Sequence, residues 1–335
     1  MRETASLQAA QPPHTPTAGV PGGIPAVVLL LALATPGAAL AAESGFAFLR
    51  APVSARGASL GGSGVSYLDG AAASFLNPAA IAAHGADASS ESPWGLAGDA
   101  SLTHHESLAD LRQESVALSG SRGPQAVALS FTSLYSERIE ERDDVGLLLG
   151  GYGLTDIAAA LTYGVALNAE WRWGLTLSYV DESFAGYRAN TWSVGSGARF
   201  QPSSLPGLSL GASVLQLGPS AHFTVDGVKG DPVALPLTLQ AGGSYALTFS
   251  PKSSLLLIAE GRQAKDEDLT GHFGAEFAYD LLALRAGYRA NTDVGEIAAG
   301  AGLKTGRFRF DYAFVSFGDG LGDTHRAELG ILFGL

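Results

Sequence analysis

The chain has 335 residues, of which 16% are charged and 46% are hydrophobic, with 44 glycines and a formal net charge of -12. A typical soluble domain has about 25% charged residues and about 7% glycine, so this chain is poor in charge and rich in glycine. A mean hydropathy of +0.18 excludes intrinsic disorder. The acidic balance argues against a nucleic-acid partner, because phosphate binding needs a basic face. Cysteine is absent, which excludes a disulfide framework and a cysteine nucleophile.

The first 41 residues have the organisation of a secretory signal peptide. The apolar stretch 26–34 has the length of a signal-peptide core and falls short of the roughly 20 residues that cross a bilayer as a helix. The small-residue sequence Ala-Leu-Ala at 39–41 follows it, so we expect a signal peptide at 1–41 with cleavage after Ala41. A buried strand is the alternative interpretation. No later segment is apolar for long enough to be a membrane helix, so insertion into a membrane would require strands.

Beyond residue 95 the chain alternates with a period of two. In one such segment Trp171, Leu175 and Tyr179 share one face, and small or polar residues share the other. The segments are about ten residues long, which is the length that a tilted strand needs to cross a membrane. Their second faces are rich in Gly and Ala, which suits a crowded lumen better than a solvated surface. Alternation alone leaves a soluble sandwich open as the alternative.

Fourteen segments of this kind are expected, and an even number brings both ends of a barrel to the same side. They begin near Gly98, Gln113, Pro124, Thr155, Ala169, Arg188, Gly207, Leu235, Lys252, Thr270, Leu281, Val294, Gly306 and His325. Long polar connections at 137–145, 218–231 and 317–324 alternate with tight turns. We therefore predict an all-β fold, a transmembrane antiparallel β-barrel of about 14 strands formed by residues 96–335.

Residues 42–95 do not follow the alternation, and we predict that they form a plug with short helices inside the barrel. Asn77 precedes Pro78, which biases it away from helical geometry, so we expect its side chain to bond the wall or its own turn inside the barrel. Arg56 should pair with a lumen carboxylate such as Glu276 or Glu296, because a lone guanidinium there would be a buried unpaired charge.

Charged residues recur at mid-strand positions near the C-terminus, on the face expected to line the lumen. They are Glu276, Arg285, Arg289, Glu296, Arg307, Arg309, Asp311 and Glu328. Unpaired charges in a narrow lumen are costly, so cross-strand pairs are expected. An ion-selective pore lining is the functional alternative.

No pattern in the sequence indicates catalysis or metal binding. His104 and His105 are adjacent, so on a strand they point to opposite faces and cannot chelate one ion. The acidic run 140–144 lacks the glycine and the spacing of a calcium loop. No serine has a strand-aligned histidine and acid. We therefore predict a protein that is not an enzyme and that has no cofactor.

Several motifs, taken in order, resemble a known family. The sequence Ala-Arg-Gly-Ala-Ser-Leu-Gly-Gly at 55–62, the segment 69–74 and Asn-Pro-Ala at 77–79 are similar to the N-terminal signature of the PorV/PorQ outer-membrane family, which is related to the FadL-type transporters of hydrophobic compounds. The C-terminal segments similar to that family's last strands are 284–289, 300–303, 311–314 and 321–326. The residues carried over as a hatch motif are Arg56, Gly61, Gly62, Asn77, Pro78 and Ala79. Ala80 stands where the motif usually has glycine.

The resemblance implies a barrel in the outer membrane of a Gram-negative type of cell, in contact with its lipid. For the best understood members it implies a part in type IX secretion, with secreted proteins or secretion machinery as partners. For the FadL relatives it implies capture of a hydrophobic small ligand and its lateral release past a kinked strand. The hypotheses are therefore a barrel that supports protein export or surface attachment, a conduit for hydrophobic molecules, and a purely structural barrel. A conduit needs an apolar pocket that reaches a gap in the wall, whereas an export partner needs long loops with an exposed apolar patch.

Overall fold

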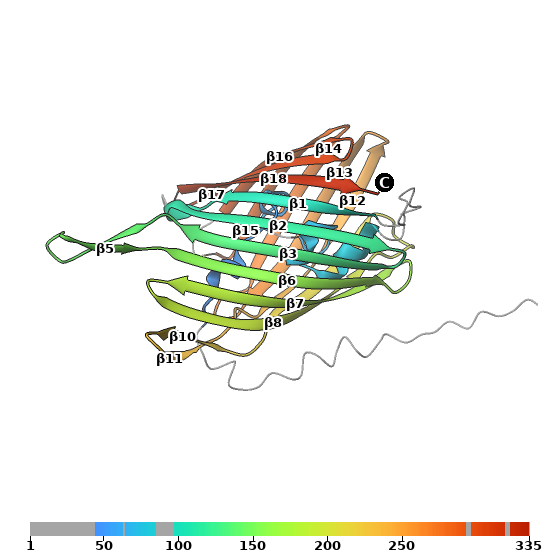
Figure 1. Ribbon diagram of the computed structural model, residues 1–335. Helices are drawn as coiled ribbons and strands as arrows, with labels where there is room; N and C mark the ends of the chain where they lie inside the picture. The colour runs from blue at the N-terminus through green and yellow to red at the C-terminus, as the bar shows by residue number, and fades with distance from the viewer. Residues whose placement is uncertain (1–43, 63, 85–96, 293–295, 319–321, 335) are drawn as a thin grey trace, which may run out of the picture.

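The computed structural model describes residues 44–62, 64–84, 97–292, 296–318 and 322–334 (Figure 1). The expected signal peptide lies outside the described residues. The main sheet closes on itself, since β1 pairs with β18 and β8 pairs with β9, and the closed ring has 14 antiparallel strands. The predicted fold class is confirmed.

Each strand of the wall begins within three residues of its predicted start. The wall strands are β1 (Ala97–Glu106), β2 (Leu111–Arg122), β3 (Gln125–Ser136), β6 (Leu154–Ala166), β7 (Trp171–Phe184), β8 (Tyr187–Phe200), β9 (Leu208–Leu217), β12 (Thr238–Ser250), β13 (Ser253–Ala264), β14 (Thr270–Tyr279), β15 (Leu282–Ala290), β16 (Glu296–Thr305), β17 (Phe308–Phe317) and β18 (Gly322–Phe333). They tilt across the barrel, as Figure 1 shows.

The wall is apolar outside and polar inside. Leu129, Leu284 and Trp192 face outward and are 57%, 66% and 54% exposed, whereas Thr162 and Asp311 face inward and are buried. Because successive side chains of a strand point to opposite faces, the period of two separates the two surfaces all around the ring. An outward apolar band with a polar interior is the arrangement of a membrane-spanning barrel.

The two ends of the barrel differ. One end has tight turns, and the other, called here the long-connection end, carries two extra hairpins (Figure 1). The strands β4 (Ile139–Arg142) and β5 (Leu148–Tyr152) form a separate two-stranded sheet that projects from the barrel. The strands β10 (Ala221–Val225) and β11 (Val228–Val233) lie in the next long connection, and β10 pairs with β8. The sequence predicted these connections as long and polar but not their short strands.

Residues 44–62 and 64–84 lie inside the barrel and are called here the plug, and residues 85–96 are outside the described part. The plug contains η2 (Ala47–Arg50), α2 (Ala55–Ala58), η3 (Ala71–Phe75) and η4 (Pro78–His84), and a further short helix, η5 (Leu108–Asp110), joins β1 to β2. Ser54 caps α2, since its hydroxyl accepts a hydrogen bond from the Gly57 amide. None of the described helices is long and apolar enough to cross a membrane.

Candidate functional site: the plug and two lumen cavities

A chain of buried charges fixes the plug to one side of the wall. Arg56 donates from Nε to Glu276 Oε2 at 2.9 Å and from Nη2 to Oε1 at 2.8 Å. Glu276 Oε2 also accepts from Arg285 Nε at 2.5 Å, and Arg285 Nη1 lies 2.7 Å from Asp311 Oδ1. These residues come from α2, β14, β15 and β17. Each of these four charged groups therefore contacts a group of opposite charge, as a buried ion network requires.

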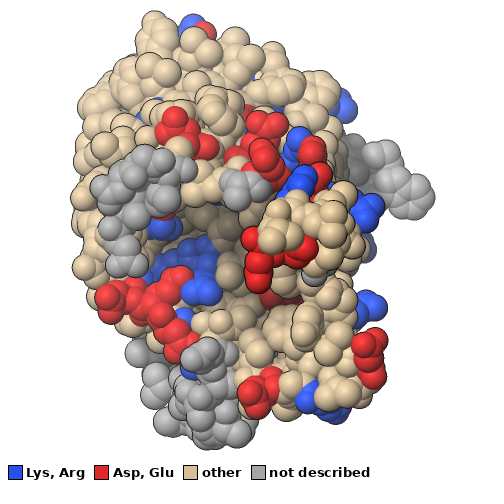
Figure 2. Space-filling view, turned by 90° about the vertical axis from the view of Figure 1, so that its left-hand side faces the viewer, with Lys and Arg blue, Asp and Glu red and all other residues tan. Residues whose placement is uncertain are grey.

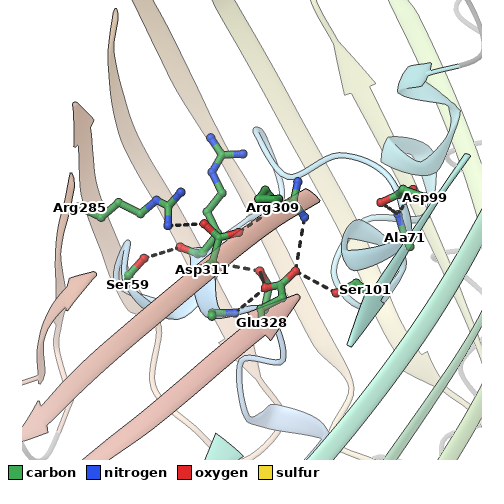
Figure 3. Close-up of polar contacts among 12 residues, drawn as sticks. Ser59, Ala71, Asp99, Ser101, Arg285, Arg309, Asp311 and Glu328 are labelled. Carbon is green, nitrogen blue, oxygen red and sulfur yellow. Dashed lines mark hydrogen bonds and ion pairs between the residues drawn. The ribbon is translucent and has the colours of Figure 1, made fainter. Parts of the chain in front are cut away.

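The network continues through Asp311 to a second contact with the plug (Figure 3). Arg309 Nε lies 3.0 Å from Asp311 Oδ2, and its Nη2 lies 3.5 Å from Glu328 Oε1. Glu328 Oε2 then accepts from the Ser54 hydroxyl and from the Ala55 amide, both at 2.8 Å. The Glu328 carboxylate thus sits at the first turn of α2, where a negative charge is favourable.

Two of the predicted lumen charges lie elsewhere. Arg289 on β15 and Glu296 on β16 are directly opposite in the ladder and form their own ion pair nearer the long-connection end. Arg307 was expected to face the lumen, and this is wrong. It lies in the tight turn between β16 and β17 and is exposed, because β17 begins at Phe308.

The Asn77 side chain joins the plug to the opposite side of the wall. It is fully buried, and its Nδ2 donates to Val65 O in the plug at 2.8 Å and to Ala198 O on β8 at 3.1 Å. Its Oδ1 accepts from the Ala79 amide at 3.1 Å, which starts the turn that Pro78 continues. The wall and its own turn therefore both bind Asn77.

Glycines of the wall and plug allow close approach at this contact. A Cβ added at Gly197 would lie 2.1 Å from Asn77 Oδ1, and one added at Gly174 would lie 2.3 Å from the Pro78 carbonyl carbon. In the plug, Gly61 and Gly62 have φ of +86 and +80, a region that side chains rarely adopt. The glycines of the hatch motif are thus required by backbone geometry.

Three further buried charges, which were not predicted from the sequence, hold the plug. Glu260 on β13 accepts from the amides of residues 64, 65 and 66 at 2.8, 3.1 and 2.9 Å. Arg199 on β8 donates from Nε to Ser66 O at 2.9 Å and pairs with Asp69. Asp99 on β1 accepts from the Ala71 amide. The signal that could have found them is the same as for the C-terminal set, since each is a charge at a lumen position of a predicted strand.

The plug leaves a small inner cavity of about 80 Å³ against the wall. The plug side of the cavity is mostly apolar, with Phe48, Leu49, Phe75 and Leu76, and its polar members are Arg50 and Ser74. The wall side consists mostly of small side chains from β3, β6, β7 and β8, many of them serine or threonine, and Gln113, Gln240 and Arg262 add further polar groups. An apolar cluster that includes Phe48, Val180 and Ala189 lies beside it.

The inner cavity borders an irregularity in the wall. Among the described strands of the ring, the pairing shifts register at two places, one at the end of β12 and the other between β8 and β9. The ladder of β8 and β9 shifts register between Val194 and Ser196, and Gln216 on β9 has a φ of 56. Leu215, Gln216 and Gly195 at this bulge all line the cavity. A bulge bends its strand and leaves a residue unpaired, so the cavity meets the wall where the ladder of β8 and β9 is locally disrupted.

A larger polar cavity, the vestibule, opens at the long-connection end. Its volume is about 1000 Å³, and it shares Arg50, Ala51, Pro52 and Arg262 with the inner cavity. Figure 2, which views this end, shows the hollow with basic side chains within it and acidic ones around its edge. In the described part of the chain no group of His, Asp and Glu is suited to hold a metal ion.

These features define a closed 14-strand barrel that carries an N-terminal plug in its lumen. No protein-family model and no curated protein matches the chain. Solved structures are similar in fold. The toluene transporter TbuX of Ralstonia pickettii is 14% identical with a TM-score of 0.54, over 85% of this chain and 98% of that chain. The toluene transporter TodX of Pseudomonas putida is 11% identical with a TM-score of 0.55, over 84% and 96%.

The monoaromatic hydrocarbon channel CymD is 12% identical with a TM-score of 0.52, over 84% of this chain and 97% of that chain. At these identities the likeness establishes the fold alone, a closed barrel with an N-terminal plug. The comparisons give no direct support to the PorV/PorQ resemblance.

Proposed function

We propose that the protein is an outer-membrane channel through which small hydrophobic molecules enter the cell. The observation that carries this proposal is the inner cavity, whose plug face is mostly apolar and which reaches the bulge between β8 and β9. A conduit needs a lumen pocket next to a local disruption of the wall, whereas a purely structural barrel does not need one. The fold shared with the hydrocarbon channels supports the same function.

The path begins in the vestibule and passes the plug segment Arg50–Pro52, which lines both cavities. From the inner cavity a hydrophobic molecule leaves sideways at Leu215 and Gln216, where the β8–β9 pairing is irregular. This exit leads directly to the apolar outer surface, so the molecule never crosses the polar charge network of the plug.

The inner cavity is too small for cargo as it stands. An apolar cavity of about 150 Å³ holds one benzene molecule, and this one measures about 80 Å³. The plug face must therefore move outward to admit an aromatic ring. We expect the short η2 helix to be the part of the lining that moves, since carboxylates of the wall hold α2 and the segment 64–71. Its movement must break the Arg50–Glu267 ion pair and the bond from Arg262 to the Arg50 carbonyl.

A matched pair of substitutions on β9 tests the proposal. Leu215→Trp fills the inner cavity, whereas Leu210→Trp places the same ring on the outward face, where Leu210 is 42% exposed. We expect Leu215→Trp to reduce toluene entry into cells or proteoliposomes at least tenfold, with Leu210→Trp unchanged. Equal toluene entry through both variants would exclude this route.

Protein export is a second candidate because the β4–β5 hairpin carries an exposed apolar patch. Val145 at its tip is 88% exposed, and Leu147, Leu148 and Leu149 are 63%, 53% and 60% exposed. The Asp143 carboxylate accepts from the amides of residues 145 and 147, which gives the tip a defined shape. Replacing Val145 and Leu147 by serine would impair secretion of a client protein if the hairpin binds such a protein, and would leave toluene entry unchanged.

A further inference from the structure

We propose that the vestibule contains a binding site for an oxyanion, built around Arg326 on β18. Arg326 is 5% exposed and lines the vestibule. Among the described residues it has no ion-pair partner, and its Nε is buried without a hydrogen-bond acceptor. The Glu296 carboxylate acts on Arg326 through its charge but forms its ion pair with Arg289. A buried guanidinium that no carboxylate contacts is costly, which is the state expected of a group whose contact partner is a ligand.

Neighbouring side chains supply further unused polar atoms on the same wall. His105 on β1 lies directly opposite Arg326 in the ladder, and Thr324 lies two residues before Arg326, on the same face of β18. Opposite residues of an antiparallel pair have Cβ atoms about 4.5–5.5 Å apart. His105 Nε2 and Thr324 Oγ1 are both buried without a partner in the described part of the chain. All three residues line the vestibule.

The wall of the vestibule has an excess of positive charge. Of the arginines Arg262, Arg289 and Arg326, only Arg289 has a carboxylate on the wall, namely Glu296. Arg262 donates from Nη1 to the Arg50 carbonyl at 2.8 Å, and its Nε is also without an acceptor. Glu296 acts through its charge on both Arg262 and Arg326, and Glu267 also acts on Arg262, but among the described residues neither arginine has a carboxylate in ion-pair contact. A planar guanidinium fork suits the oxygens of a carboxylate or phosphate.

Three acidic groups, Asp266, Glu267 and Asp268, lie at the edge of the vestibule, and two of them are engaged in other contacts. Glu267 pairs with Arg50 at 2.6 Å, and Asp266 binds Lys265 and the Ser44 amide at 3.2 and 2.8 Å. These groups lie in the connection between β13 and β14, where water screens them. Figure 2 shows the same separation, with basic side chains in the hollow and acidic ones at its edge. An anion that enters the hollow thus meets free donors.

The ligand is an oxyanion, either free or carried by an apolar molecule, and this inference does not depend on transport. Equilibrium dialysis of the full-length mature protein in a nonionic detergent, with labelled phosphate and labelled benzoate as probes, separates the two sources. Stronger binding of phosphate indicates a free anion, and stronger binding of benzoate indicates an anion on an apolar body. Either result supports the site, and toluene serves as the uncharged control.

The variants Arg326→Gln and Thr324→Val test the assignment, with Arg307→Gln as the control because Arg307 is an exposed arginine at the opposite end. We expect Arg326→Gln to weaken anion binding at least about tenfold, Thr324→Val to weaken it less, and Arg307→Gln to leave it unchanged. Heat-modifiable migration on gels reports whether each variant has folded. Absence of anion binding to the wild type, or equal binding by folded Arg326→Gln and Arg307→Gln, would overturn the proposal. Neither result would bear on toluene entry, which the Leu215→Trp experiment measures separately.

Discussion

Arg56 and Glu276, which are 220 residues apart in the sequence, face each other as a two-bonded ion pair that joins the plug to β14. Burial by itself would lower the pKa of the Arg56 guanidinium, but the Glu276 carboxylate outweighs burial and raises that pKa above its usual value. Arg56 therefore stays charged, and the contact persists at every pH at which the Glu276 carboxylate is ionised.

Replacing Arg56 by alanine removes this contact and should loosen the plug while the barrel stays closed. Breaking a buried pair costs about 3–5 kcal/mol, although Glu276 keeps Arg285 as a partner, so we expect a value near the lower limit. Limited proteolysis should cut the plug faster in Arg56→Ala than in the wild type. Arg188→Ala is the control, because Arg188 also forms an ion pair, with Asp181, but its own side chain is 65% exposed. Equal cleavage rates in the two variants would contradict the assigned role.

A side chain at Gly197 should displace the plug from β8. The Cβ of Gly197→Ala would lie 2.1 Å from Asn77 Oδ1, which forces the Asn77 side chain out of its hydrogen bonds. Gly120→Ala is the matched control, because a Cβ on Gly120 meets nothing within 4 Å. We expect the thermal midpoint of Gly197→Ala to fall and that of Gly120→Ala to stay unchanged, as followed by heat-modifiable migration. A lower midpoint for both variants would show that any side chain on a wall glycine destabilises the barrel.

The sequence predicted the wall well because a barrel strand is specified locally. The alternation of Trp171, Leu175 and Tyr179 fixes which face is outside, and no long-range contact is needed to see it. Arg307 was misplaced because the turn at Gly306 extends one residue further than expected, which leaves Arg307 outside the ladder.

The contacts of the plug were less predictable, because they join residues that are distant in the chain. The sequence indicated that Arg56 needs a carboxylate, but not that Glu276 rather than Glu296 provides it. Glu260 was missed because it binds three backbone amides, and no charged residue in the plug signals such a partner. The bulge at Gln216 depends on how β9 meets β8, which is a relationship between strands rather than a local pattern.

Two substitutions of Asn77 should weaken the plug to different extents. Asn77→Ala leaves the carbonyls of Val65 and Ala198 without their donor, at roughly 1 kcal/mol each. Asn77→Asp keeps an acceptor for the Ala79 amide but places a carboxylate against those two carbonyls, which should cost more. We expect the order wild type, Asn77→Ala, Asn77→Asp in decreasing resistance of the plug to protease. The reverse order of the two variants would mean that the contact with the Ala79 amide dominates.

A disulfide between plug and wall can test whether the plug must move for cargo to pass. The chain has no cysteine, so two introduced cysteines have no competing thiols. A Cβ on Gly274 would lie 3.0 Å from the Leu60 Cβ and 2.9 Å from the Leu60 carbonyl oxygen. A small outward shift of the plug relieves this contact and brings the two Cβ atoms to the roughly 3.5–4.5 Å of a disulfide. We expect Leu60→Cys with Gly274→Cys to form a bond on oxidation. Leu60 belongs to the part of the plug that the charge network already holds. If only η2 moves to admit cargo, the bond should therefore leave toluene entry unchanged. Leu60→Cys with Gly120→Cys is the control, which should not cross-link. If the oxidised protein stops toluene entry and a reductant restores it, the plug moves as a whole, and the route along η2 alone is wrong.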